Sequence, residues 1–201
     1  MKPLPLLFLN TALKSAVADG RADAVEIYEV DKDHSQVTFQ VRHMLSRTRG
    51  RFSDFEGTVR LDPEHLESSS VDFRVWAASI DTGNAQRDEH LRSGDFFEAE
   101  RYPQVIFRSE RVERVAEDRY EVTGTLTLRG VEKRLVLPVT FLGSAKDPWG
   151  NVKAGFATEA VLNRKEFGMV WNAALESGGF LLGDEVSLTI ELETTRQAAA
   201  A

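Results

Sequence analysis

Four histidines are among the residues of this chain that could serve as metal ligands or as general bases near neutral pH: His34, His43, His65 and His90. No two of them are two, three or four residues apart, the spacings that place ligands on one face of a strand or helix. The sequence therefore predicts no metal site, and it carries no signature of a bound cofactor. His43 ends an apolar strand face, so we expect it to point inward as a hydrogen-bonded lining residue.

Several carboxylates crowd one segment of the chain: Asp81, Asp88, Glu89 and Asp95. A general acid and base pair could be drawn from this group. The structural alternative is that Asp81 opens a turn while its neighbours form a solvated or mutually paired helical surface, made of Arg87, Asp88, His90 and Arg92. The chain has no cysteine and no GxSxG, GxxxxGK, GxGxxG or HExxH motif, so the usual nucleophile, phosphate-binding and zinc signatures are all missing.

A dense basic patch stands out in an acidic chain, at Arg42, Arg47, Arg49 and Arg51. Guanidinium groups bind phosphates in a bidentate manner, so Arg42, Arg49 and Arg51 are predicted to hold an anionic head group. A charged, solvated hairpin turn is the alternative. The net charge of −7, from 25 Lys and Arg against 32 Asp and Glu, disfavours a nucleic-acid partner.

The N-terminal segment is ambiguous. Lys2, the apolar stretch 4–9 and the small residues 16–18 outline a secretory signal, but Pro5 and Lys14 interrupt that outline. We therefore divide the chain into an extension at 1–25, disordered or a degenerate signal, one domain at 26–195 and a loose tail at 196–201. No apolar run approaches the 18 or so residues of a transmembrane helix, so no transmembrane segment is expected.

Alternation of apolar and polar residues dominates from Ile27 onward and predicts antiparallel strands with one wet face. Val186, Leu188, Ile190 and Leu192 show it most cleanly. The expected strands span 27–30, 35–43, 51–62, 69–77, 104–113, 119–129, 133–142, 153–163 and 185–194. Residues 84–95 lack alternation and predict a short helix, capped by Thr82 or Asn84. Residues 164–184 predict a long loop.

So many antiparallel strands must protect their edges, and closure into a barrel removes the edges altogether. A two-sheet sandwich is the alternative. A barrel of about eight strands has an interior that side chains fill or that holds one small ligand. The fold class is therefore all-β, and whether the interior is filled is the functional question.

Ordered motifs along most of the chain resemble the YceI-like polyisoprenoid-binding family. The resemblance runs from about Tyr28 to Glu193 and is carried by Tyr28-Glu29-Val30-Asp31, Val41-Arg42-His43-Met44, Arg49-Gly50-Arg51-Phe52, Asp81-Thr82-Gly83-Asn84, Asp88-Glu89-His90-Leu91, Asp95-Phe96-Phe97, Asp147-Pro148-Trp149-Gly150, Asn163-Arg164-Lys165-Glu166-Phe167-Gly168, Trp171-Asn172 and Leu182-Gly183-Asp184-Glu185-Val186. It implies an extended eight-stranded antiparallel β-barrel of lipocalin-like shape with a long-chain isoprenoid or fatty lipid in its pore. It also implies a homodimer and a cytoplasmic location, or a periplasmic one if residues 1–18 act as a signal peptide.

Two functions from different classes follow. The first is a non-enzymatic protein that binds a long apolar lipid in a tunnel, for storage, transport or sequestration, with the lining Phe39, Val41, His43, Phe73, Val75, Phe107, Leu126, Leu137, Val139, Phe156, Phe167, Trp171 and Leu188. The alternative for these residues is a filled core. The second function is a small hydrolase or isomerase at the barrel mouth, using His43, Asp88 and His90. The apolar loop at 164–184 is expected to be a flap over one end, a static plug or a dimer contact.

Overall fold

The computed structural model describes residues 25–62, 65–175 and 180–198. The predictions for the signal-like segment and for the last three residues of the tail lie outside these ranges. None of the described helices is long and apolar enough to cross a bilayer.

Ten strands and a few short helices make up the described chain. The strands are β1 Glu26–His43, β2 Ser46–Phe52, β3 Phe55–Leu61, β4 Ser70–Trp76, β5 Ile80–Asp81, β6 Gln104–Arg114, β7 Arg119–Leu128, β8 Val131–Lys146, β9 Val152–Asn163 and β10 Leu182–Arg196. The helices are α2 Ala85–Arg92 and the 3-10 turns η1 Leu66–Ser68, η2 Ala77–Ser79 and η3 Arg164–Phe167.

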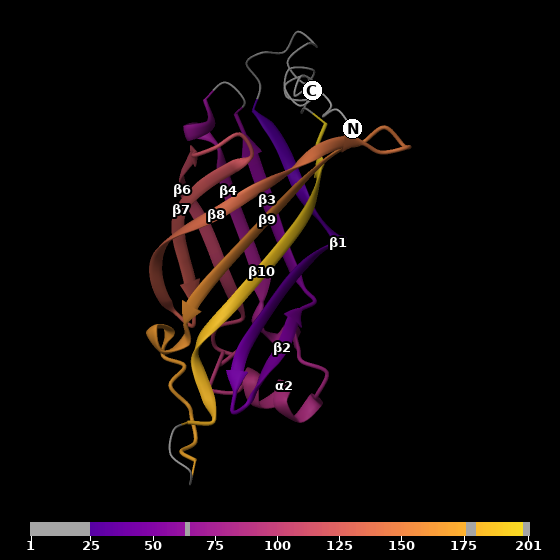
Figure 1. The fold of residues 1–201 in the computed structure, drawn as a ribbon. Coiled ribbons are helices and arrows are strands. Elements are labelled where there is room, and N and C mark those ends of the chain that lie inside the picture. The colour runs from indigo at the N-terminus through magenta and orange to yellow at the C-terminus, as the bar shows by residue number, and fades with distance from the viewer. Residues whose placement is uncertain (1–24, 63–64, 176–179, 199–201) are drawn as a thin grey trace, which may run out of the picture.

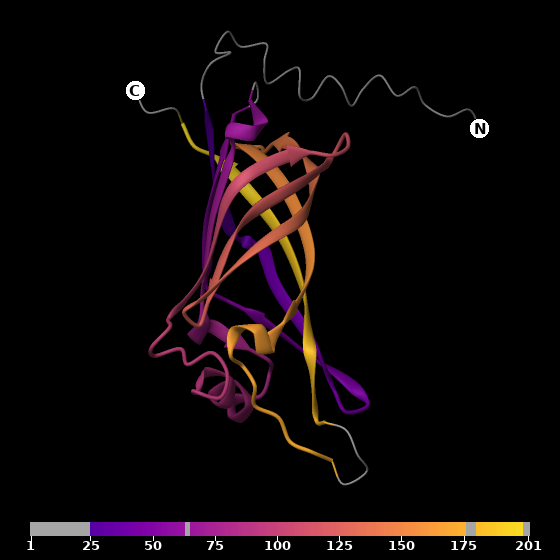
Figure 2. The ribbon, with the colours of Figure 1, turned by 90° about the vertical axis from the view of Figure 1, so that its left-hand side faces the viewer.

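Eight of these strands form a closed antiparallel ring in the order β10, β9, β8, β7, β6, β4, β3 and β1, and β1 pairs again with β10. The short strands β2 and β5 extend the sheet from the far half of β1. Figures 1 and 2 show an elongated barrel with α2 and the 168–175 segment at one end and the β8–β9 hairpin at the other. The prediction of an eight-stranded all-β barrel is confirmed.

Strand β1 is longer than the sequence predicted. The segments 27–30 and 35–43 were expected as two strands, but the structure joins them through an irregularity between Asp31 and Gln36. At this bulge the Ser35 hydroxyl donates to the Glu193 carbonyl at 3.2 Å and accepts from the Glu193 amide at 3.0 Å. A side chain thus replaces the missing backbone partners, so the strand continues through a break in the alternation.

The prediction of a single strand at 51–62 is wrong, because the structure divides this segment between β2 and β3. Residues 46–50, expected as part of a turn, belong to β2. The division falls at Ser53 and Asp54, where the Ser53 amide donates to Ser79 and the Asp54 carbonyl accepts from Trp76. β2 pairs with the second half of β1 and β3 with its first half, so the chain changes its partner region at this point.

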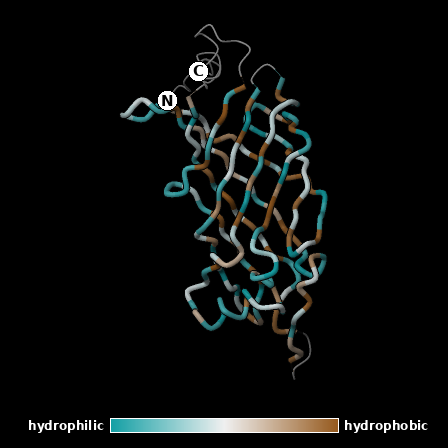
Figure 3. The backbone as a smooth tube through the Cα atoms, turned by 180° about the vertical axis from the view of Figure 1, so that it is seen from behind, coloured by the Kyte–Doolittle hydropathy of each residue, from teal (hydrophilic) through white to brown (hydrophobic). Residues whose placement is uncertain are grey.

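Alternation and turn chemistry explain the remaining strands. Hydrophobic and hydrophilic residues alternate along the tube in Figure 3, as expected for strands with one face inward. Arg129 and Gly130 both adopt positive φ, 52° and 73°, which is the two-residue turn that joins twisted strands such as β7 and β8. At the β8–β9 turn, Asp147 Oδ1 accepts from the amides of Trp149 and Asn151.

Two local predictions near the barrel end have different outcomes. The helix expected near 84–95 is present as α2, and Asn84 caps it by accepting from the Arg87 amide at 3.0 Å. The loop expected at 164–184 is shorter, because η3 occupies its start and β10 begins at Leu182. Asn163 initiates η3 by accepting from the Lys165 amide at 3.0 Å.

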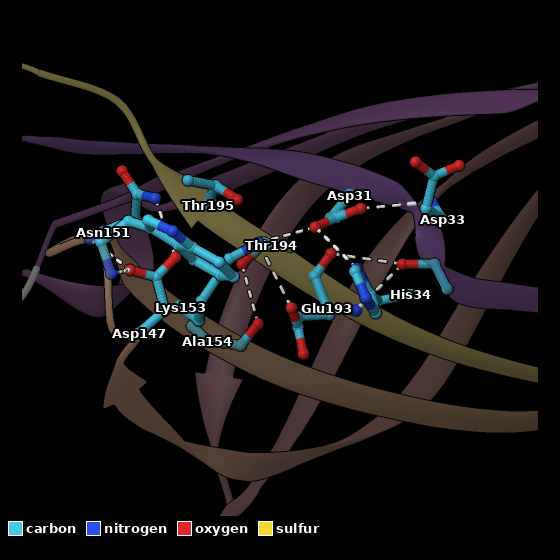
Figure 4. Close-up of polar contacts among 12 residues, drawn as sticks. Asp31, Asp33, His34, Asp147, Asn151, Lys153, Ala154, Glu193, Thr194 and Thr195 are labelled. Carbon is cyan, nitrogen blue, oxygen red and sulfur yellow. Dashed lines mark hydrogen bonds and ion pairs between the residues drawn. The ribbon is translucent and has the colours of Figure 1, made fainter.

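A polar network ties the closing strands together near the bulge (Figure 4). Lys153 Nζ on β9 lies 2.6 Å from Asp31 on β1 and 3.3 Å from Glu193 on β10. His34 Nδ1 lies 3.1 Å from the Asp31 carboxylate. Asp31, His34 and Glu193 offer ligand atoms within 4.8 Å of one another, but the Lys153 ammonium lies against both carboxylates. The hydrogen bond from Lys153 lowers the pKa of Asp31 to about 2 against the opposing effect of burial.

We predict that Asp31→Asn destabilises the fold at pH 7. The unfolded carboxyl titrates near pH ~3.9, so its contribution is complete above about pH 4 and is lost as the pH falls through about 2. The melting temperature should drop by about 2–4 °C per kcal/mol lost in a chain of this size. Thermal unfolding from pH 7 down to pH 2 measures it, and the gap to wild type should shrink with acid. Asp33→Asn, an exposed neighbour, is the control. A gap of equal size at every pH would contradict the role of the charge.

Candidate functional site

The barrel encloses an elongated cavity of about 600 Å³, a size typical of small-molecule sites. It begins near α2 and runs between the walls as far as Val37, Phe107 and Ile190. Its lining is mostly aliphatic and aromatic, with rings from Phe39, Phe52, Phe73, Phe96, Phe97, Phe107, Phe167 and Trp171. Such a surface favours an apolar molecule without demanding a particular one.

Three of these rings lie against the barrel wall over glycines. A Cβ added at Gly50 would come within 2.4 Å of Phe39 Cζ, and one at Gly57 within 2.5 Å of Phe73 Cδ2. Phe107 covers Gly124 in the same way, at 2.6 Å. Each ring therefore occupies the space that a side chain on the neighbouring strand would fill. Because the rings lie along the wall, they leave the centre of the barrel open.

The opposite end of the barrel is filled instead. Tyr28, Val112, Val122, Ala154 and Thr194 are buried there, and Thr194 Oγ1 donates to the Ala154 carbonyl at 2.9 Å. Burial and the neighbouring Glu26 raise the pKa of Tyr28, whose hydroxyl donates to that carboxylate at 2.8 Å. The cavity is therefore closed on the side of the β6–β7 and β8–β9 hairpins. We expect a ligand to enter from the α2 end.

The α2 end is where the lining becomes polar. Asn84, Gln86 and Arg87 line the cavity and are exposed, so the cavity reaches the surface there. Arg87 donates from Nε to the Thr82 hydroxyl at 2.7 Å and from a terminal nitrogen to the Thr82 carbonyl at 2.9 Å. Within the described residues no carboxylate lines the cavity. The mouth is thus polar and cationic.

His43 and His90 both line this mouth. His90 Nε2 lies 2.8 Å from Asp95, and its ring meets Trp171 edge to face at 4.8 Å and Phe96 at 5.1 Å. These contacts join α2 to the segment after η3 and make one wall of the mouth.

Buried Arg164 fixes the start of the predicted loop. Its guanidinium donates to the carbonyls of Gly183 at 2.9 Å, Met169 at 2.6 Å and Trp171 at 2.8 Å, and it pairs with Asp184. Burial lowers the pKa of Arg164, although Asp184 opposes the shift. Arg164 therefore ties the carbonyls of Met169 and Trp171 to the start of β10. The flap, the static plug and the dimer contact stay predictions for this loop. Residues 176–179 lie outside the described chain.

The structure brings most of the predicted lining residues together. Those that line the cavity are Phe39, Val41, His43, Phe73, Val75, Phe107, Leu126, Leu137, Phe167, Trp171 and Leu188. Val139 and Phe156 do not line it. They share the inward face of β8 and β9 but lie farther toward the filled end, where Phe156 packs on Phe141 with ring centroids 5.6 Å apart.

The basic patch lies outside the cavity. In β1, Val41 and His43 face inward, so Arg42 between them faces outward, and the β1–β2 register puts Arg47, Arg49 and Arg51 on the same outer face. Arg51 pairs with Asp81 at 3.0 Å. This alternation does not allow Arg42, Arg49 or Arg51 to hold the head group of a ligand inside the barrel.

The carboxylate cluster has structural roles. Asp81 Oδ1 accepts from the Gly83 amide at 2.9 Å, as expected for a residue that opens a turn. Asp88 is buried and accepts from both the amide and the hydroxyl of Thr82, at 2.9 Å and 2.6 Å. Asp88 does not line the cavity and is not placed to act on a ligand with His43 or His90.

Other lining residues were missed, among them Phe52, Phe96, Phe97, Leu128, Leu135, Ala160, Leu162, Met169, Val186 and Ile190. A signal for some of them exists, because Val186 and Ile190 alternate with Ser187, Thr189 and Glu191. No periodicity marks Phe96 or Met169, which tertiary contacts bring to the mouth.

Comparisons with known proteins agree with this architecture. The profile of the YceI-like domain matches residues 28–194. A UPF0312 protein of Azotobacter vinelandii is 37% identical over 199 residues, covering 98% of each chain. The crystal structure of Burkholderia cenocepacia BcnA is similar with a TM-score of 0.69 and 26% identity, over 82% of this chain and 98% of that one. A Saccharophagus degradans domain described as polyisoprenoid binding has a TM-score of 0.65 at 15% identity, over 85% and 98%.

We predict that Gly57→Ala moves the Phe73 ring off the wall and into the cavity. The added methyl group would overlap Phe73 Cδ2 and approach Val30 Cγ2 to 3.1 Å. Overpacking of this kind costs about 1–3 kcal/mol, which urea unfolding measures. Gly94→Ala is the control, because a Cβ there meets nothing within 4 Å. Equal stability of the two variants would contradict the packing of rings over glycines.

Proposed function

The chain belongs to the YceI-like domain family, and we propose that it binds a long apolar lipid, of polyisoprenoid or fatty-amide type, inside the barrel. The observation that carries the proposal is the apolar cavity of about 600 Å³, closed at one end and polar at the other. A chain-like molecule with one polar end fits this arrangement. Its tail would lie between the walls, and its polar end would stay at the α2 mouth.

Burial of the tail supplies the affinity. Each methylene removed from water contributes about 0.8 kcal/mol, so a long chain gains enough to offset the loss of its own freedom. No specific polar contact is needed in the interior of the barrel. Affinity should therefore depend more on the length of the apolar chain than on its particular functional groups. Storage, transport and sequestration are all compatible with binding of this kind.

The polar end of the ligand is best placed beside Arg87. Arg87, Asn84 and Gln86 line the mouth with exposed donors, and His43 faces the same space. This replaces the outward-facing Arg42, Arg49 and Arg51 as the head-group site.

Two further observations support binding over catalysis. Thr82 already engages Asp88, the carboxylate of the alternative acid–base set. The Saccharophagus degradans domain described as polyisoprenoid binding shares the barrel fold. Cytoplasmic location and a homodimer remain predictions from the family resemblance.

The proposal predicts that Ala160→Trp blocks ligand binding. Ala160 lines the cavity, so an indole at this position would occupy the lumen that the ligand needs. Displacement of a fluorescent fatty-chain probe by a polyprenol or a fatty amide measures the effect, and we expect at least about a tenfold loss of affinity, since ~1.4 kcal/mol of lost burial is tenfold.

Val161→Trp is the matched control. Val161 follows Ala160 on β9 but is 61% exposed, so an indole there leaves the lumen unchanged. Probe binding that survives Ala160→Trp, or that falls equally in both variants, would place the ligand outside the barrel.

A further inference from the structure

The β1–β2 hairpin carries an arginine stripe on its outer face, formed by Arg42, Arg47 and Arg49. Arg42 lies directly opposite Arg47, and Arg49 lies opposite Gln40. Arg49 also borders a groove of about 590 Å³ on the outer surface, together with Gln40, Ser187 and Thr189. The stripe therefore combines guanidinium groups with hydroxyl and amide hydrogen-bonding groups on one open surface.

The stripe has no counterions within the described residues, where Arg42, Arg47 and Arg49 form no ion pair. Asp81 nearby pairs with Arg51, and Asp184 pairs with Arg164 and Lys165. Glu185 of β10 forms no ion pair with the stripe either. Like charges placed directly opposite on neighbouring strands are destabilising. An anionic surface outside the protein would remove that repulsion.

An apolar tip adjoins the stripe. Leu45 at the end of the hairpin is 95% exposed and Met44 is 44% exposed. The Met44 amide donates to the Leu181 carbonyl at 2.9 Å, which holds the tip against the residue that precedes β10. The neighbouring Phe180 is 67% exposed, and the Lys165 ammonium lies 5.9 Å from the centre of its ring. Figure 2 shows the hairpin projecting beyond the barrel wall at the end where α2 lies. Leu45 and Met44 thus form a protruding apolar tip.

We propose that the arginine stripe and the apolar tip dock the protein on an anionic bilayer, with the tip inserted beneath the head groups. The chain carries a net charge of −7, so an anionic membrane repels most of the molecule and attracts this stripe. The tip offers two large side chains on a narrow projection, whereas a stable protein interface needs roughly 800 Å² from each partner.

Docking in this orientation would bring the cavity mouth to the membrane. His43 lines the cavity and belongs to the same hairpin as Leu45. A lipid too insoluble to cross water could then pass between bilayer and barrel. That consequence rests on the proposed function, but the docking itself does not.

Vesicle flotation with the full-length protein tests the docking. We expect binding to vesicles of phosphatidylcholine mixed with phosphatidylglycerol, weak binding to phosphatidylcholine alone, and release at about 1 M salt, where the Debye length is about 3 Å. Replacing Arg42, Arg47 and Arg49 together by Gln should weaken binding roughly a hundredfold, since each charge near an anionic surface contributes about fivefold. Leu45→Ser should weaken binding even where the charge is unchanged.

Matched controls lie at the opposite end of the barrel. Replacing Arg60, Arg114 and Arg119 by Gln changes the net charge equally, and Trp149→Ser removes an apolar side chain that is 85% exposed on the β8–β9 hairpin. Both should bind vesicles as wild type does. Ala160→Trp should also bind normally, which separates docking from ligand binding. Equal binding to both kinds of vesicle, no binding by the wild type, or equal losses in the stripe variant and its control would each overturn the proposal.

Discussion

The pairing of one long strand on both of its edges is the constraint on which the rest of the structure depends. β1 pairs with β10 along one edge, and with β3 and then β2 along the other. The first contact closes the ring, so no edge strand is left in it. The pairing along the other edge places β3 and β2 one after the other along β1. Ser35 and the Lys153 ion pairs hold β1 against β10 where its own ladder is interrupted.

Closure alone does not decide whether a barrel is hollow. Here the inner face of β1 changes character along its length, from buried Tyr28 at the filled end to Phe39 over Gly50 at the open end. Three rings lie on glycines of neighbouring strands, which moves aromatic volume from the axis to the wall. The cavity therefore depends on the positions of Gly50, Gly57 and Gly124 as much as on the apolar residues that line it.

Alternation was enough to predict most of the strands, the all-β class and most of the inward residues, because period two is a direct consequence of strand geometry. The choice of a barrel over a sandwich came from the need to protect strand edges and from the family resemblance. Alternation failed where side-chain hydrogen bonds replace the backbone ladder, or where a loop interrupts a strand. Ser35 hydrogen-bonds across the bulge in β1 where the pattern breaks, and Ser53 and Asp54 divide the segment 51–62 that was expected as one strand. Alternation predicts that Val139 and Phe156 face inward, but it does not predict that they lie in the filled half of the barrel.

The basic patch also shows what the sequence could not predict. Their density in the sequence marked a basic patch, but its side of the barrel follows from the register of β2 on β1, since a shift of one residue would have turned the patch inward. Likewise the anchoring of the 164–171 segment depends on Arg164 donating to three carbonyls, those of Met169, Trp171 and Gly183. Such contacts have no local signature in the chain.

The central claim, that the barrel holds a chain-like apolar molecule, is tested most directly by native mass spectrometry. The full-length protein would be stripped of lipid and incubated with polyprenols and fatty amides of increasing length. The account predicts complexes of one lipid per chain that persist in the native spectrum, disappear on denaturation and become more abundant as the apolar chain lengthens. An unliganded mass at every chain length would contradict it.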